Sequence, residues 1–307
     1  MRRHRSQACL WVALLQWLCA PMAGAQTQQP GTASGAPALE PLHSDGSYLK
    51  SFLIAPKPDG PCPPNIDPIY QANVIVTGTD MRQRPWGFAE TLRTVLVKSS
   101  GDPRLKAEPR TEQLAQHADG LVVCFSYVDM MADIPIHDEQ GTYDRPHRLT
   151  VTFDPAKIDA ILAEFGDKPW RGERPVVVPV LLVHGPGPTP YVLSADNPAG
   201  ADQRASFQTW AGEAGMEVRF PSAVELAEWD VATDRFPGNT PQSRAGEAIV
   251  TGMLDWRETL PGWVGQWRMR WHGADHTWGI SGVNYDAAFR DIVRGVVLVA
   301  SGNGSPG

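Results

Sequence analysis

The chain has 307 residues, of which 42% are hydrophobic and 20% are charged, and its 34 acidic residues outnumber its 27 basic ones. The net charge of −7, with no run of Lys or Arg after the first few residues, argues against nucleic acid and anionic lipid surfaces as partners. The length is sufficient for two small domains.

The N-terminal segment has the pattern of a secretory signal peptide. Three arginines precede an apolar run over residues 8–20, and small residues at Ala23 and Ala25 match a signal-peptidase site. We expect cleavage between Ala25 and Gln26, which removes three arginines and brings the net charge to about −10. Because the apolar run is too short for a permanent transmembrane helix, we predict a periplasmic protein with no stable membrane span.

The cysteines raise the questions of lipid anchoring and of disulfide formation. Cys19 follows the bulky Leu18, whereas a lipid-modified cysteine normally follows Gly, Ala or Ser, so release is favoured over anchoring. The mature chain keeps Cys62 and Cys124. In an oxidising compartment these two cysteines either form a disulfide or remain free thiols, with Cys62 exposed and Cys124 buried. The residues alone favour neither alternative.

Residues 26–66 are rich in Pro, Gly, Gln and Ala, and such a segment cannot bury enough apolar surface to fold, so we predict a flexible linker. A first αβ unit is expected over residues 67–172. Gly101 and Gly166 are expected to end its two longer helices. Its predicted elements are a strand over 70–77, a helix over 85–100, helical turns from 102 and from 111, strands over 121–128 and 147–153, and a helix over 155–165.

A second αβ unit is expected over residues 173–302, followed by a tail over 303–307. Its first strand is almost continuously apolar, which predicts burial on both faces of a sheet. Its predicted strands lie over 176–183, 191–194, 216–220, 249–256, 262–272 and 277–283. Helices are predicted over 197–214 and 288–297. Two shorter helices are predicted, one after the capping box of Ser222 and Glu225 and one that begins at Thr240. The fold class is α+β (mixed α/β), with two tandem small αβ units, the second ending in a three-stranded antiparallel meander covered by a C-terminal helix.

The middle strand of the meander has the clearest alternation in the chain. One face carries Trp263, Trp267, Met269 and Trp271, and the other carries Gln266, Arg268, Arg270 and His272. The apolar face is either the core beneath the last helix, which we favour, or a stacking platform for a ligand. The row of Arg268, Arg270 and His272 is either a partner-binding face or a plain solvated strand face, and both interpretations are open.

One loop collects residue types that bind metal ions. It contains His137, Asp138, Asp144 and His147, but it lacks the alternating oxygen spacing of a calcium loop. A solvated loop is therefore the favoured interpretation, and a metal site is the alternative.

No local motif in the chain identifies an enzyme. The nucleophile elbow, the His-Glu-x-x-His zinc motif and the phosphate-binding loop are all missing from the sequence. His272 and His276 have the spacing of zinc ligands on a helix, but we expect a turn between strands there, which destroys that geometry. Two carboxylates distant in sequence, such as Glu139 and Asp255, could act together as acid and base only if the fold placed them side by side, and nothing in the sequence indicates this.

Several short segments together resemble a known protein family. They are residues 95–102, 125–127, 149–155, 169–170 and 252–254, with Trp263 and Trp267. The chain resembles, over residues 70–301, the bacterial exported proteins grouped as domain of unknown function 2066. That family has no established activity or catalytic residue, so the resemblance implies an exported location and an arrangement of elements but no site.

These observations favour a non-enzymatic binding or envelope-assembly accessory factor. We expect it to bind another envelope protein through its second αβ unit, without a cofactor, and the residues do not indicate an oligomeric state. The alternative is a metal-assisted hydrolase that uses the loop from His137 to His147.

Overall fold

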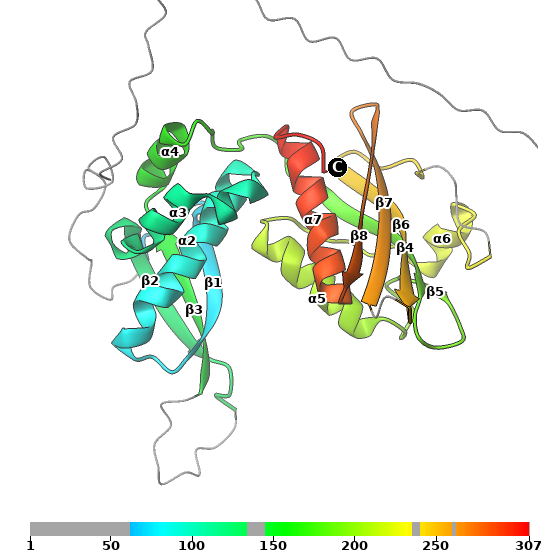
Figure 1. Ribbon diagram of the computed structural model, residues 1–307, viewed down its shortest axis with the longest axis horizontal. Helices are drawn as coiled ribbons and strands as arrows, with labels where there is room; N and C mark the ends of the chain where they lie inside the picture. The colour runs from blue at the N-terminus through cyan, green and yellow to red at the C-terminus, as the bar shows by residue number, and fades with distance from the viewer. Residues whose placement is uncertain (1–61, 134–144, 235–239, 260–261, 307) are drawn as a thin grey trace, which may run out of the picture. The chain divides into compact units, whose positions relative to one another are not determined.

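The computed structural model describes residues 62–133, 145–234, 240–259 and 262–306. All of them belong to one of the two units into which the contacts divide the chain, Asp45–Gly307. The predicted signal peptide, Cys19, most of the predicted linker and the loop residues His137, Asp138 and Asp144 lie outside the described residues. The structure is mixed α+β, as the sequence predicts (Figure 1).

A three-stranded antiparallel sheet with the order β1-β3-β2 forms the first half. Its strands are β1 (Gln71–Thr77), β2 (Val122–Asp129) and β3 (Pro146–Phe153), and its helices are α2 (Arg84–Ser100), α3 (Pro109–Ala115) and α4 (Pro155–Glu164). Short 3-10 helices η1 (Pro68–Tyr70), η2 (Met81–Gln83), η3 (Pro103–Ala107) and η4 (Ala118–Leu121) connect them.

Local sequence signals determine where the helices of this half end. Gly101 has a φ of 75°, which favours glycine, and its N–H donates to the Val97 carbonyl to close α2. The carboxylate of Asp154 accepts hydrogen bonds from the N–H groups of Ala156 and Lys157 at the start of α4. Apolar side chains of α2 are then fully buried against one face of the sheet.

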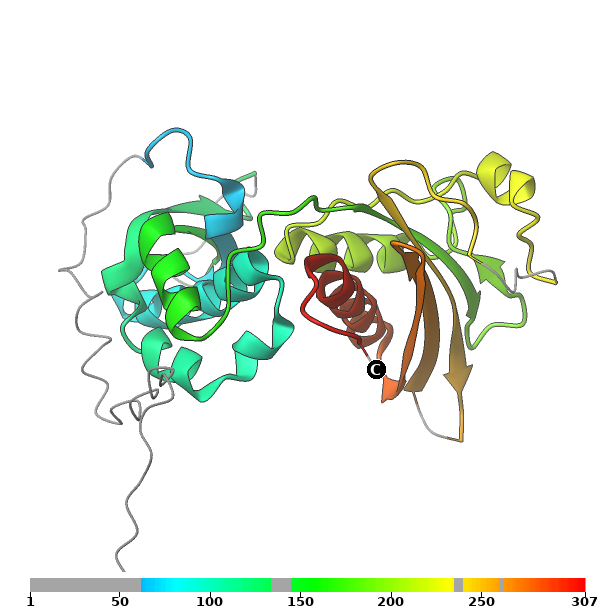
Figure 2. The ribbon, with the colours of Figure 1, turned by 90° about the horizontal axis from the view of Figure 1, so that it is seen from above.

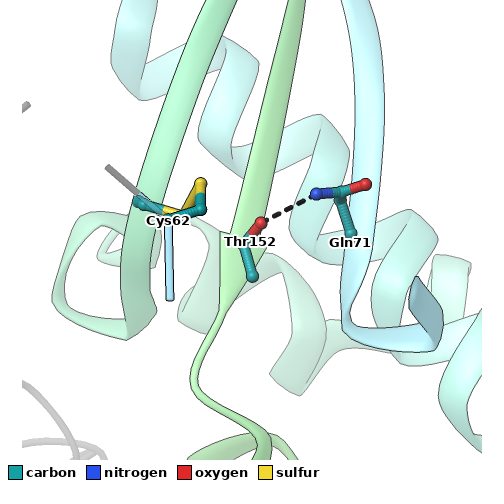
Figure 3. Close-up of a disulfide and its surroundings, with 4 residues drawn as sticks. Cys62, Gln71 and Thr152 are labelled. Carbon is teal, nitrogen blue, oxygen red and sulfur yellow. Dashed lines mark hydrogen bonds between the residues drawn. A yellow bond between two sulfur atoms is a disulfide. The ribbon is translucent and has the colours of Figure 1, made fainter. Parts of the chain in front are cut away.

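The disulfide alternative for the two cysteines of the predicted mature chain is confirmed. Cys62 and Cys124 are bonded, with 5.2 Å between their Cα atoms (Figure 3). Cys124 lies opposite Thr152 in the sheet, and Thr152 lies opposite Gln71, whose Nε2 donates to the Thr152 Oγ1 at 3.0 Å. The bond therefore fixes the residues just before the sheet to its edge strand β2.

A five-stranded sheet with the order β5-β4-β6-β7-β8 forms the second half. Its strands are β4 (Val176–His184), β5 (Tyr191–Val192), β6 (Glu247–Arg257), β7 (Gly262–Trp271) and β8 (Ala274–Val283), and its helices are α5 (Ala201–Glu213), α6 (Ala223–Glu228) and α7 (Tyr285–Ser301). Only β4 and β6 run parallel, and β6, β7 and β8 form the predicted antiparallel meander. Helix α7 covers one face of this meander, as predicted (Figure 2).

Strand β4 is buried on both faces, as its continuous apolar run predicts. Val177 and Leu181 belong to the core that contains α5 and α7. Val178 and Val180 point to the opposite face, where they pack with Leu226 of α6. A strand with alternating polarity would offer an apolar surface on only one of its two faces, so either α6 or the pair α5 and α7 would have none to cover.

The tryptophan face of β7 is the core under α7, which confirms the structural interpretation. Trp267 is 2% exposed and Met269 is fully buried. The indole of Trp267 lies so close to Gly252 and Gly265 that an added Cβ would stand 2.5 Å and 2.0 Å from ring atoms. Its Nε1 donates to the Asp291 carboxylate at 3.3 Å, which satisfies the polar end of the ring.

Two predicted elements of the second half are wrong. The predicted strand over 216–220 is only a bridge between Val177 and Val218, although Met216 and Phe220 lie in the core as a strand face would. The predicted helix from Thr240 is missing from the described residues 240–246, where the sequence offers no apolar stripe to bury. Strand β7 also ends one residue early: His272 has a φ of 48° and opens a two-residue turn with Gly273.

Lys98 holds the end of α2 against the chain before β1. Its Nζ donates to the carbonyl oxygens of Pro68 at 2.8 Å and Gln71 at 3.1 Å. The Arg174 guanidinium donates to the Lys98 carbonyl at 2.6 Å. Burial, assisted by the charge of Arg174, lowers the pKa of Lys98 from 10.5 to about 8.

We expect Lys98 to make the protein more stable as the pH rises from about 8 to about 10.5. The pKa of Lys98 is about 8 in the folded chain and near 10.5 in the unfolded chain, so the unfolded chain binds more protons in this window. The free energy of unfolding then increases with pH, by about 3 kcal/mol over the full window. Urea unfolding across this range should show a flatter profile for Lys98→Met than for the wild type, and parallel profiles would contradict the assignment.

Candidate functional site

The described residues cover the second face of the five-stranded sheet only in part. Helix α6 packs over the β4 and β5 end of this face, whereas α5 and α7 lie on the other side of the sheet (Figure 2). We use the name open face for the exposed residues that strands β6, β7 and β8 present beyond α6. They include Met253, Gln266, Arg268, Arg270, Asp275 and Thr277.

The sheet register explains how the two arginines come to lie on the open face. Arg268 lies between Thr251 of β6 and Thr277 of β8, and Arg270 lies opposite Asp275 of β8. The Arg270 guanidinium is 3.9 Å from the Asp275 carboxylate, and both side chains are about 60% exposed. A loose, solvent-exposed ion pair of this kind contributes little to stability, so Arg270 can exchange its partner for another carboxylate.

A cavity of about 350 Å³ adjoins the turn end of the open face. Arg270 and His272 line it together with Ile249 and residues 240–243. The Thr240 hydroxyl is buried there without a hydrogen-bond partner within the described chain.

A histidine and a carboxylate meet at the other end of β6. His184 ends β4, Asp255 lies near the end of β6, and the two face each other in the parallel register. The Nδ1 of His184 is 2.6 Å from the Asp255 carboxylate, which Arg257 also contacts at 3.1 Å. A carboxylate that orients an imidazole is one part of a general-base arrangement, but the described chain gives His184 no bond to a hydroxyl or thiol nucleophile.

The pair of His184 and Asp255 was not predicted from the sequence, although the sequence contains a signal for it. Both residues are polar and follow apolar strand segments, and in α/β sheets the carboxyl ends of parallel strands gather functional groups. From the sequence, Asp255 was discussed only as a possible neighbour of Glu139, which lies outside the described residues.

Only one of the four predicted metal ligands, His147, lies within the described residues. His147 lies on β3, where its Nδ1 is 2.8 Å from the Arg145 carbonyl oxygen, while its three predicted co-ligands lie outside the described residues. His272 is in the turn and His276 is on β8, so they do not share a helix. Within the described ranges no group of three or more His, Cys, Asp or Glu side chains is placed to hold a metal ion.

Comparisons with known proteins add little to this description. None of the helices that the structure describes is long and apolar enough to cross a membrane. A search of the curated proteins finds no significant match, and a search of the solved structures finds none either. Residues 65–171, which include the three-stranded sheet and helices α2, α3 and α4, match the family model of a domain of unknown function (DUF8605), and not the domain of unknown function 2066 that the sequence resembles.

Proposed function

We propose that the protein is an exported, non-enzymatic envelope protein that binds an acidic segment of another envelope protein along its open face. The signal-peptide pattern and the predicted cleavage after Ala25 support the export and a periplasmic location. Arg268 and Arg270 contact carboxylates of the partner, and the adjoining cavity of about 350 Å³ accepts one of its side chains.

The observation that carries this proposal is a row of two arginines on an uncovered strand face of an acidic protein. The chain has a net charge of −7, and yet Arg268 and Arg270 follow each other on one side of β7. The opposite side of the same strand is packed under α7, so this side is the one that remains accessible. Arg270 also lines the adjoining cavity, which lies at the turn end of the same strand.

The alternative of a metal-assisted hydrolase stays a prediction. Three of its four residues, His137, Asp138 and Asp144, lie outside the described residues. The His184 and Asp255 pair gives a general base to any such chemistry, but it lies on β4 and β6 rather than beside His147 on β3.

Reversing the charge of both Arg268 and Arg270 should abolish partner binding without unfolding the protein. We expect Arg268→Glu/Arg270→Glu to change the free energy of unfolding by less than about 1 kcal/mol, because both side chains lie on an exposed strand face. Charge repulsion should then prevent an acidic segment from binding. Crosslinking pull-downs from envelope extracts, performed with the mature protein from Gln26 onward, measure which partners the wild type and the variant recover.

A variant with the same charge change elsewhere serves as the control. Arg82→Glu/Lys168→Glu alters two exposed cations on the first half of the described chain and should recover the same partners as the wild type. Binding of the wild type should weaken as salt concentration increases. Identical partners for both double variants and the wild type would reject the open face as the site, and no partner for any of them would reject the binding function.

A further inference from the structure

A second cavity, of about 360 Å³, lies on the α7 side of the five-stranded sheet, away from the open face. Helices α5 and α7 form most of its walls, and α2, η3 and β8 complete them. Its apolar lining includes Val97, Trp210, Ile280, Val293 and Val297. This volume lies in the range of small-molecule sites, and an aromatic ring beside aliphatic side chains is the usual lining of such sites.

The charged residues of this cavity differ in whether they have hydrogen-bond or ion-pair partners. Asp291 accepts a hydrogen bond from the Trp267 Nε1 at 3.3 Å, and the Arg294 guanidinium lies 3.8 Å from its carboxylate. Lys106 and Arg290, by contrast, have no hydrogen bond or ion pair within the described chain. The Arg290 guanidinium instead lies 5.1 Å from the ring centroid of Trp210. Within the described chain, two cations thus line the cavity beside Glu213 and Asp291 without a hydrogen bond or an ion pair to either.

Glu213 lines the same cavity, but within the described chain it forms no ion pair with Lys106 or Arg290. Partial desolvation raises the pKa of Glu213, while the charges of Lys106 and Arg290 oppose this shift. The lining contains the cations Lys106, Arg290 and Arg294 and the acidic residues Glu213 and Asp291, so the cations are in excess. The unpaired charge in the cavity is positive, with a carboxyl nearby that can donate a hydrogen bond when it is protonated.

We propose that this cavity binds a small amphipathic anion, such as a carboxylate with an apolar chain or ring. The apolar body of the ligand packs on Trp210 and the valines of α7. Its carboxylate accepts hydrogen bonds from Lys106 and Arg290, which are stronger than bonds between neutral groups. The site is separate from the open face and does not depend on partner binding there.

Calorimetric titration with decanoate tests the proposal on the mature protein from Gln26 onward. We expect one binding site per chain with a dissociation constant in the micromolar range. The cation decyltrimethylammonium, which has the same apolar chain, should bind at least about tenfold more weakly, because Lys106 and Arg290 repel it. Equal affinity for the two ligands, more than one site per chain, or no binding of decanoate would overturn the proposal.

Two variants locate the site. Lys106→Gln/Arg290→Gln should weaken decanoate binding at least about tenfold, whereas Arg82→Gln/Lys168→Gln should bind it like the wild type. If the first variant does not fold, the single change Lys106→Gln at an exposed position replaces it, with an expected loss of severalfold. An unchanged affinity in a folded Lys106 variant would place the ligand elsewhere and reject the cavity as its site.

Discussion

Replacing Trp267 with alanine should lower the free energy of unfolding by about 3–5 kcal/mol, the cost of removing a large buried aromatic side chain. The indole is 2% exposed and fills the space that Gly252 and Gly265 leave on the sheet beneath α7. The cavity left by the substitution cannot collapse easily, because a sheet and a long helix form its walls. Asp291 also loses the N–H donor that now satisfies its partly buried carboxylate.

Urea unfolding of the variant and the wild type measures this effect. Trp86→Ala is the matched control, since Trp86 is 50% exposed on α2 and its removal should cost less than about 1 kcal/mol. A Trp267 variant as stable as the wild type would mean that the tryptophan face is not core. The interpretation of that face as a ligand platform would then return.

Breaking the disulfide should destabilise the protein by about 4 kcal/mol. Cys62 and Cys124 are 62 residues apart, and the chain-entropy model gives about 4 kcal/mol for a closed loop of this length. Cys62→Ser is the informative change, because Cys62 is exposed and serine costs nothing there, whereas Cys124 is 2% exposed and belongs to the interior. The physical cause is the larger number of conformations that the unfolded chain gains without the bond.

Unfolding with and without a reductant separates this effect from other consequences of the substitution. The mature wild-type protein, produced in an oxidising compartment, should lose stability when the reductant is added, and Cys62→Ser should not respond. The denatured wild type should also show no free thiol until it is reduced. Two titratable thiols in that protein would mean that the bond does not form.

Local sequence signals were enough to predict most of the helices and strands. The Asp154 cap and the left-handed Gly101 limit their helices at the predicted positions, because a cap depends only on residues within one turn. The alternation along β7 predicted the buried tryptophans and the exposed Arg268 and Arg270, because a strand has two faces of opposite polarity. These features arise from neighbours in sequence, so no knowledge of the tertiary structure was needed.

Features that depend on strand pairing were decided only by the tertiary structure. The parallel register of β4 and β6 brings His184 to Asp255, and the edge position of β2 brings Cys124 to Cys62. The cavity with Lys106, Glu213 and Arg290 needs elements from both halves of the described chain. The sequence of residues 216–220 is typical of a strand, but the segment pairs with β4 only through the bridge between Val177 and Val218. Each outcome depends on which surfaces distant in sequence pack together. A hydrophobic pattern predicts that a face of an element is buried, but it does not identify the element that packs against this face.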